Sequence, residues 1–216
     1  MKSLGKTWCS YRTICATVPS FLQLLFTFNF SLFTAMYRGA IEVICGCMFS
    51  GKTEELLRRI RRAELARLPV QLFKHAIDTR YTEGHVESHS SMKLPAIGAM
   101  TVAELRDKLS PQAWIIGIDE AQFYEPGIVD FVVDLANRGR RVLIAGLATD
   151  FRGQPFGSMP QLLAVADEVT KLQAVCMVCG SPATCTQRLT TSTEIVVVGA
   201  KDAYEARCRQ CFRPSI

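Results

Sequence analysis

A glycine-rich segment, GCMFSGKT at residues 46–53, constrains the fold of this 216-residue chain more than any other feature. It fits the pattern GxxxxGK[ST], in which the backbone amides of a tight turn surround phosphate oxygens at the amino end of a helix. The apolar run 41–45 before it indicates a buried strand, and Leu56, Ile60 and Ala63 after it recur at helical spacing. This context predicts a phosphate-binding loop. The alternative is a helix cap with an incidental lysine and threonine.

The residues of this loop suit a nucleoside triphosphate with its magnesium ion. Lys52 would reach the outer phosphates, and the Thr53 hydroxyl would be a ligand of Mg²⁺. The whole loop is expected to lie at the nucleotide: Gly46, Cys47, Met48, Phe49, Ser50, Gly51, Lys52 and Thr53.

A pair of acids follows another apolar run, WIIGIDEAQF at residues 114–123. Asp119 closes this run, so we expect it at the end of a neighbouring strand, where its carboxylate would provide the second protein contact to Mg²⁺. Glu120 comes next and could accept a proton from a reacting group. The alternative is that both acids merely precede the helix expected at 128–137.

Short apolar runs alternate with helical patterns from residue 36 onward. This alternation predicts an α/β fold, a P-loop (RecA-like) mostly parallel sheet with helices on both faces. Residues 77–98 read as a polar loop, and the arginines of the first helix as a solvated face. The predicted strands are 41–45, 70–73, 114–119 and 141–147, and the predicted helices are 52–68, 101–109 and 128–137.

Four of the nine cysteines form two CxxC pairs, Cys176 with Cys179 and Cys208 with Cys211. Two such pairs favour a tetrahedral four-thiolate zinc site, which is structural because no coordination position stays open. A disulfide or a thiol redox centre is the alternative. Nine is an odd number and the chain is long for a disulfide scaffold, so the remaining cysteines indicate thiols in a reducing compartment.

The first 35 residues differ from the rest, with three basic residues, no acid and an apolar run at 21–33. A secretory signal, a transit peptide and a start assigned upstream of Met36 are all compatible with this pattern, while the run is short for a membrane span. We therefore divide the chain into an N-terminal extension (1–35), a nucleotide-binding α/β domain (36–173) and a zinc-binding domain (174–216).

The charge of the body argues against one class of partner. The chain has a formal charge of +5, but from residue 36 onward 22 basic residues face 20 acidic ones. A body this close to neutrality is not typical of a nucleic-acid-binding protein.

Six segments in order resemble the zinc-containing thymidine kinase family, over nearly all of the chain from Met36 to Arg213. They are GCMFSGKTEEL, DTRY, DEAQF, DFRGQPFG, KLQAVCMVCG and VVVGAKDAYEARCRQC. The resemblance implies transfer of the γ-phosphoryl group of ATP to the 5′-hydroxyl of thymidine, with Mg²⁺ and a structural Zn²⁺. It also implies a C-terminal lasso, a loop between the two cysteine pairs that closes over the nucleoside.

The resemblance assigns roles to individual residues. Glu120 would be the general base on the 5′-hydroxyl, Asp119 would act through Mg²⁺, Gln122 would lie at the nucleotide, and Arg80 would lie over the transferring phosphate. The residues around the nucleoside would be Phe151, Phe156, Ile195, Val196, Val197, Val198, Gly199 and Tyr204. The zinc ligands would be Cys176, Cys179, Cys208 and Cys211.

The resemblance further suggests a homotetramer, feedback inhibition by dTTP and a cytoplasmic location, with no nucleic acid or membrane as partner. Cys47, Ala148 and Ala200 depart from residues common in the family, and none is a proposed base or zinc ligand. Two other functions compete with the kinase: a P-loop ATPase acting on nucleic acid with the zinc ribbon as its grip, and a nucleotide sensor without turnover. Nucleic-acid-stimulated ATP hydrolysis would favour the former.

Overall fold

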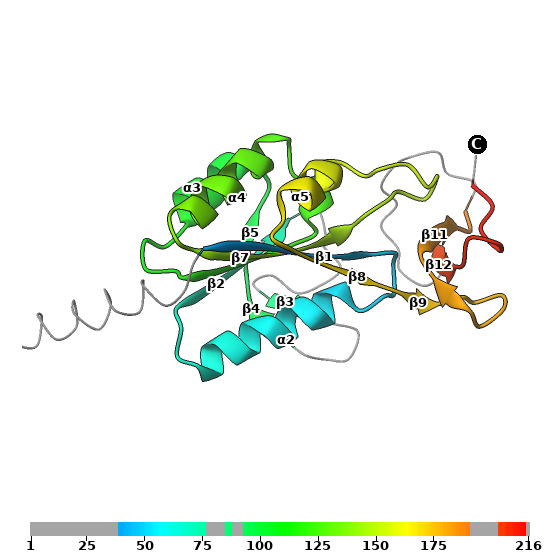
Figure 1. Cartoon of the computed structure of the whole chain (residues 1–216), viewed down its shortest axis with the longest axis horizontal. Helices are drawn as coiled ribbons and strands as arrows, with labels where there is room; N and C mark the ends of the chain where they lie inside the picture. Colours follow the sequence, from blue (N-terminus) through cyan, green and yellow to red (C-terminus); the bar gives the residue numbers. More distant parts are fainter. Residues whose placement is uncertain (1–38, 77–84, 88–92, 191–202, 215–216) are drawn as a thin grey trace, which may run out of the picture. The chain divides into compact units, whose positions relative to one another are not determined.

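A six-stranded sheet with helices on both faces forms the body of the computed structural model, which describes residues 39–76, 85–87, 93–190 and 203–214 (Figure 1). The chain divides into two units, Met1–Arg38 and Gly39–Ile216, and the apolar run of the N-terminus lies outside the described residues. The strand order is β5-β2-β6-β7-β1-β8, and every pairing in this sheet is parallel. The predicted fold class is confirmed.

The sheet strands are β1 (Ala40–Gly46), β2 (Val70–His75), β5 (Ile97–Ala99), β6 (Ile115–Asp119), β7 (Arg141–Leu147) and β8 (Glu168–Leu172). The helices are α2 (Lys52–Leu65), α3 (Val102–Lys108), α4 (Gly127–Asn137), α5 (Met159–Val165) and the short η1 (Ala121–Phe123). Four short strands form two antiparallel hairpins near the C-terminus. They are β9 (Ala174–Val175) with β10 (Pro182–Ala183), and β11 (Cys185–Arg188) with β12 (Tyr204–Arg207). A further short pair joins β3 (His85–Glu87) to β4 (Lys93–Pro95).

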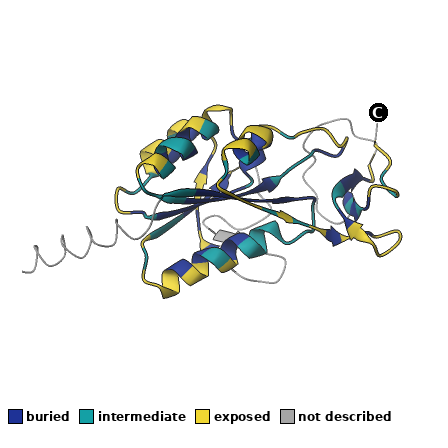
Figure 2. Ribbon diagram, viewed as in Figure 1, coloured by how far each residue is buried: buried dark blue, intermediate teal, exposed yellow. Residues whose placement is uncertain are grey.

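The two faces of the sheet bury separate cores because successive strand side chains point to opposite sides. On β1, Val43 and Cys45 pack with residues of α3, α4 and α5, whereas Ile44 packs with α2. The central strands β1, β6 and β7 are buried along most of their length, whereas the edge strand β8 is largely exposed, and the helices are exposed on their outer sides (Figure 2). The apolar stripe of α2 that spacing predicted is confirmed: Leu56, Leu57, Ile60 and Ala63 are buried.

Two expectations about the sheet were wrong. Residues 77–98 were read as loop, but β3 and β4 lie within them and β5 begins there, and β5 is an edge strand of the sheet. These strands have three residues each, too few for a period-2 pattern to register. The strand that carries Asp119 is also not the immediate neighbour of β1, because β7 lies between them.

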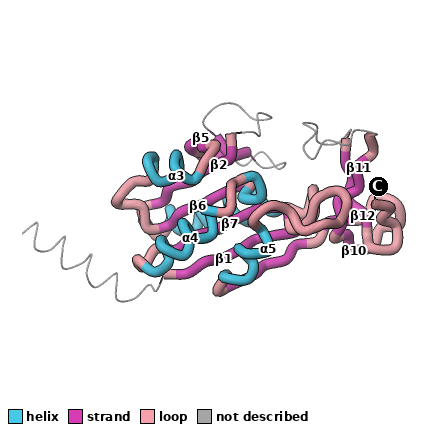
Figure 3. The backbone as a smooth tube through the Cα atoms, turned by 90° about the horizontal axis from the view of Figure 1, so that it is seen from above, coloured by secondary structure: helices cyan, strands magenta, loops and turns pink. Residues whose placement is uncertain are grey.

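The parallel strands bring their carboxyl ends to one edge of the sheet, as seen from above in Figure 3. The hairpins β9–β10 and β11–β12 lie beyond this edge (Figures 1 and 3). Ligands of open parallel sheets bind at this edge, so the fold places the predicted phosphate loop, the acid pair and the cysteine pairs together.

Candidate functional site

The glycine-rich loop joins the carboxyl end of β1 to the amino end of α2 and requires glycine at both ends. A Cβ on Gly46 would lie 2.6 Å from the Leu172 carbonyl oxygen and from Ser50 Oγ. Gly51 has a φ of 83°, in the left-handed region that side chains disfavour, and it starts α2. The loop therefore presents a helix amino end and close-packed backbone amides, the arrangement that binds phosphate.

The side chain of Lys52, the first residue of α2, lies against this loop. Its Nζ donates to the Cys47 carbonyl oxygen at 2.8 Å, and Ser50 Oγ donates to the same oxygen at 2.8 Å. Burial lowers the pKa of Lys52, and the nearby Glu120 carboxylate opposes that shift. The ammonium group thus lies beside the loop and next to the acid pair, where an incoming phosphate could replace the carbonyl as its partner.

Thr53 and Asp119 meet although they come from different elements. Thr53 Oγ1 donates to Asp119 Oδ2 at 3.2 Å, and the Glu120 amide donates to Oδ1 at 3.0 Å. Neighbouring ligands of an octahedral Mg²⁺, with metal–oxygen distances of about 2.0–2.1 Å, lie roughly 3 Å apart, so the two oxygens fit this ion. Burial raises the pKa of Asp119 to about 7, and the Glu120 carboxylate acts in the same direction. A divalent cation would stabilise the ionised form.

Glu120 turns the chain at the end of β6. Its φ is 56°, a strained conformation for a residue with a side chain, and this turn directs Glu120 and Asp119 to the same edge of the sheet. Gln122 Nε2 donates to Glu120 Oε2 at 2.6 Å, and Gln122 Oε1 accepts the Leu147 amide at 3.0 Å. Gln122 therefore fixes the Glu120 carboxylate relative to the end of β7.

The aromatic residues expected around a nucleoside fall into two groups. Phe151 and Tyr204 are buried together with Ala203, and Met48 and Phe49 of the glycine-rich loop pack against them. Phe156 instead meets Phe123, with ring centroids 5.7 Å apart and planes at 87°. The first group thus adjoins the phosphate loop directly.

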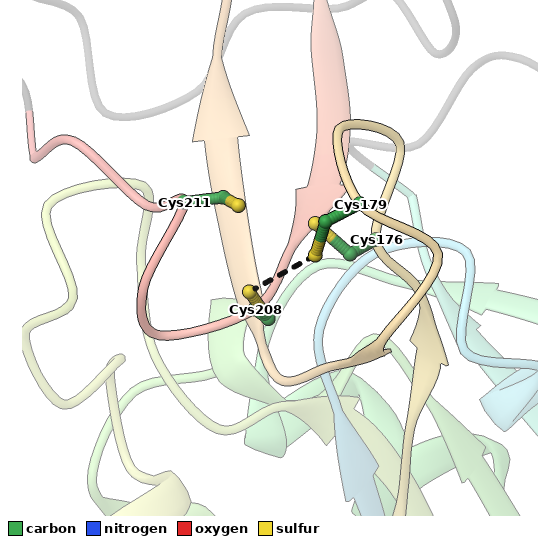
Figure 4. A group of neighbouring side chains, drawn as sticks. All are labelled: Cys176, Cys179, Cys208 and Cys211. Atoms are coloured by element: carbon green, nitrogen blue, oxygen red, sulfur yellow. Dashed lines mark hydrogen bonds between the residues drawn. The ribbon is translucent and has the colours of Figure 1, made fainter.

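The four cysteines of the two CxxC pairs converge between the C-terminal hairpins (Figure 4). Their sulfur atoms all lie within 4.8 Å of one another, and those of Cys179 and Cys208 are 3.6 Å apart. A tetrahedral zinc with Zn–S distances of about 2.3 Å separates its sulfurs by roughly 3.8 Å. The cluster therefore fits a four-thiolate zinc ion.

The phosphate loop and the cysteine cluster share a core. Cys47 is buried in a group that includes Cys176, Cys208, Ala183 and Ala206. Its Sγ donates to the Ala183 carbonyl oxygen at 3.4 Å. The amide of the following residue, Met48, donates to Thr186 Oγ1 at 3.0 Å. The C-terminal hairpins thus hold the loop in place through Cys47 and Met48.

Some predicted residues lie outside the described part of the chain, namely Arg80 and the segment 195–199 (Ile195, Val196, Val197, Val198 and Gly199). Sequence reasoning also missed residues that the structure places here: Phe123 against Phe156, Thr186 against Met48, and Arg188 against Phe151 and Tyr204. Nothing in spacing or composition separates Arg188 from the other arginines of the chain.

Comparison with known proteins gives one consistent family. The sequence model of the family described as "Thymidine kinase" matches residues 39–212. A thymidine kinase of Bdellovibrio bacteriovorus is 52% identical over 179 residues, which cover 83% of this chain and 88% of that protein.

Two solved structures match this chain at low sequence identity. Domain III of the Thermotoga maritima replication initiation protein DnaA has a TM-score of 0.42 at 16% identity, over 68% of this chain and 61% of that one. The Legionella pneumophila ATPase DotB has a TM-score of 0.39 at 13% identity, over 71% of this chain and 46% of that one.

Proposed function

The chain belongs to the thymidine kinase family, and from this premise we propose that it transfers the γ-phosphoryl group of ATP to the 5′-hydroxyl of thymidine, with Glu120 as general base. The observation that carries the proposal is the meeting of the phosphate loop with the acid pair, where Thr53 Oγ1 lies 3.2 Å from Asp119 Oδ2. Charge neutralisation and proton acceptance are then available at one point, which is what phosphoryl transfer requires.

The proposed reaction uses the geometry in a single displacement. Glu120 accepts the proton of the 5′-hydroxyl while its oxygen forms a bond to the γ-phosphorus. The bond from that phosphorus to the β–γ bridging oxygen breaks, and ADP leaves with the electron pair. Lys52 and the loop amides Cys47–Thr53 offset the charge on the phosphates. Gln122 keeps Glu120 in place through the 2.6 Å hydrogen bond.

Two metal ions belong to the proposal. Thr53 and Asp119 would hold Mg²⁺, which supplies charge neutralisation at the β- and γ-phosphates when bound. Cys176, Cys179, Cys208 and Cys211 would hold a structural Zn²⁺, which links the two hairpins. Support comes from the oxygen and sulfur distances given above.

The nucleoside would lie beside the phosphate loop. We place Phe151, Phe156 and Tyr204 around the thymine, with the main chain of 195–199 reading the base and Arg80 at the transferring phosphate. The packing of Met48 and Phe49 against Phe151 and Tyr204 supports this position, because a nucleoside next to the γ-phosphate must border the loop.

Assembly and location rest on the family resemblance. We propose a homotetramer, inhibited by dTTP, that acts in the cytoplasm, with residues 1–35 as an extension to the α/β domain (36–173) and the zinc-binding domain (174–216). Buried thiols at Cys45 and Cys47 agree with a reducing compartment. Among the described residues, no helix is both long and apolar enough to cross a membrane.

The test is to incubate the purified protein with ATP, Mg²⁺ and thymidine, and to measure dTMP and ADP. Equal amounts of the two products are expected. ADP formation without dTMP, stimulated by DNA or RNA, would instead identify the competing P-loop ATPase. No turnover by a zinc-loaded, folded protein would identify a nucleotide sensor.

A further inference from the structure

Arg188 lies at the end of β11 and is buried against the two aromatic residues that adjoin the phosphate loop. Only 3% of its surface is exposed. Its guanidinium carbon lies 3.5 Å from the centroid of the Phe151 ring and 5.1 Å from that of Tyr204. Its Nη2 donates to the Tyr204 hydroxyl at 2.5 Å. One side chain therefore contacts both rings at once.

These contacts join parts of the chain that are distant in sequence. Arg188 pairs with Tyr204 across the β11–β12 hairpin, whereas Phe151 follows β7 of the parallel sheet. Met48 and Phe49 of the phosphate loop pack on the same group. Arg188 thus links the β11–β12 hairpin to the end of the parallel sheet, next to the proposed phosphate-binding loop.

A buried guanidinium is a costly way to fill space, because an apolar side chain of similar volume would avoid the desolvation of a charge. A guanidinium differs from an apolar side chain because its interactions depend on orientation. Its plane stacks on an aromatic face, and its fixed N–H groups orient a hydroxyl. The geometry at Arg188 uses both properties, the first on Phe151 and the second on Tyr204.

We propose that Arg188 is a positioning residue for thymidine: it sets the orientation of Phe151 and Tyr204, and through them the affinity for the nucleoside. The inference rests on the proposed function, which places these two rings around the thymine. Arg188 acts on the substrate through the rings. Its removal should therefore weaken thymidine binding more than ATP binding.

The test compares Arg188→Met, Arg188→Lys and the full-length wild-type protein, by steady-state kinetics with each substrate varied. We expect the KM for thymidine to rise about 10-fold or more in both variants, while the KM for ATP changes less than about 2-fold. Lysine keeps the charge but lacks the planar stack, so it should not restore the wild-type KM.

Arg152→Gln is the matched control. Its guanidinium also lies over the Phe151 ring, at 5.6 Å, but its side chain is 44% exposed and pairs with Asp150. We expect a thymidine KM within about 2-fold of the wild type. Zinc content and the midpoint of thermal unfolding are measured for every variant, so that a folding defect is separated from a positioning defect.

A double-mutant cycle with Tyr204→Phe asks whether Arg188 acts through the ring. The loss caused by Arg188→Met in kcat/KM for thymidine should be smaller in the Tyr204→Phe background than in the wild type. Additive losses would contradict the proposal, and so would a wild-type thymidine KM in Arg188→Lys or an equal rise in both KM values.

The two proposals fail in different ways. If the wild type forms no dTMP, the proposed function fails. If the wild type is active and the Arg188 variants have its thymidine KM, only the positioning role fails. If Arg188→Met does not fold, Arg188→Lys and the cycle built on it decide the outcome by the same criteria.

Discussion

The backbone of Gln122 packs so closely against Gly157 that no side chain fits at position 157. A Cβ on Gly157 would lie 2.1 Å from the Gln122 carbonyl oxygen, and Gly157 has a φ of 51°. At this scale the sequence predicted where the acid pair lies, because Asp119 ends an apolar strand and Glu120 follows it. It could not predict the contacts of Gly157 or Arg188, because these contacts join residues that are far apart in the chain.

Gly157→Ala should both destabilise the fold and slow the reaction. We expect a loss of about 1–2 kcal/mol from the left-handed backbone and a further 1–3 kcal/mol from overlap with Gln122. The displaced Gln122 would then hold Glu120 less well, so kcat should fall. Denaturant unfolding and steady-state kinetics measure the two effects.

Gly139→Ala is the control, since Gly139 has a φ of 82° but no atom within 4 Å of an added Cβ. It should lose only the backbone contribution and keep its kcat. Equal losses of stability in the two variants would show that the contact with Gln122 is not tight.

At the scale of elements, an ion network ties α2 to the sheet. Glu42 of β1 is buried and pairs with Arg59 of α2, at 2.5 Å, and with Arg141 of β7. Arg59 also pairs with Glu55 and Glu168. The helix arginines were all predicted to be solvated, which is wrong for Arg59, because helical periodicity shows the buried stripe but not its charged border.

Glu42→Gln should destabilise the fold by about 3–5 kcal/mol, since it leaves two arginines without the buried charge that they share. Glu168→Gln, at an exposed position of the same network, should change stability by less than about 1 kcal/mol. Denaturant unfolding at pH 7 measures both. Equal effects would mean that burial of Glu42 contributes nothing to the pair.

The same network predicts that the free energy of unfolding falls at acid pH. Burial raises the pKa of Glu42, but Arg141 and Arg59 outweigh it, so the pKa lies below the ordinary 4.5. Hydrogen bonding to Arg58 is the largest factor lowering the pKa of Glu55, to about 2. Because both pKa values are depressed on folding, their stabilisation is present above pH 4.5 and is lost as the pH falls toward 2. In Glu42→Gln the free energy of unfolding should depend less on pH below 4.5. The same pH dependence in the variant and the wild type would contradict the assignment to Glu42.

Among elements, segments with a clear apolar run or a helix cap were predictable, and segments without either were not. β7 has the bounds that its apolar run predicts, and Thr101 caps α3 by accepting the Glu104 amide. α5 was missed because seven residues with a proline give little periodicity. β8 was missed because this edge strand is largely exposed and lacks an apolar run.

At the scale of the whole molecule, the two C-terminal hairpins that hold the cysteine cluster pack against the glycine-rich loop. Cys47 lies in the core that contains Cys176 and Cys208, and Thr186 accepts the Met48 amide. The sequence predicted the two sites separately from their motifs. Their contact follows from the position of the hairpins beyond the carboxyl ends of the parallel strands, which no local pattern encodes.

Loss of zinc should therefore weaken ATP binding as well as thymidine binding. Cys179→Ser is expected to lose the metal and about 10-fold or more in ATP affinity, equivalent to about 1.4 kcal/mol. Cys185→Ser, at a cysteine outside the cluster, should keep one zinc per chain and wild-type affinity. Metal analysis and ATP titration check both, and unchanged ATP affinity in a zinc-free protein would contradict the coupling.

The most direct test of the central claim is kcat for dTMP formation by Glu120→Gln, compared with Glu125→Gln. The Glu125 carboxylate accepts the Val102 amide, a bond that glutamine can keep. We expect Glu120→Gln to lose about 10²-fold or more in kcat, because it cannot accept the proton of the 5′-hydroxyl, and Glu125→Gln to stay near the wild type. A Glu120→Gln variant with wild-type kcat would show that Glu120 is not the base.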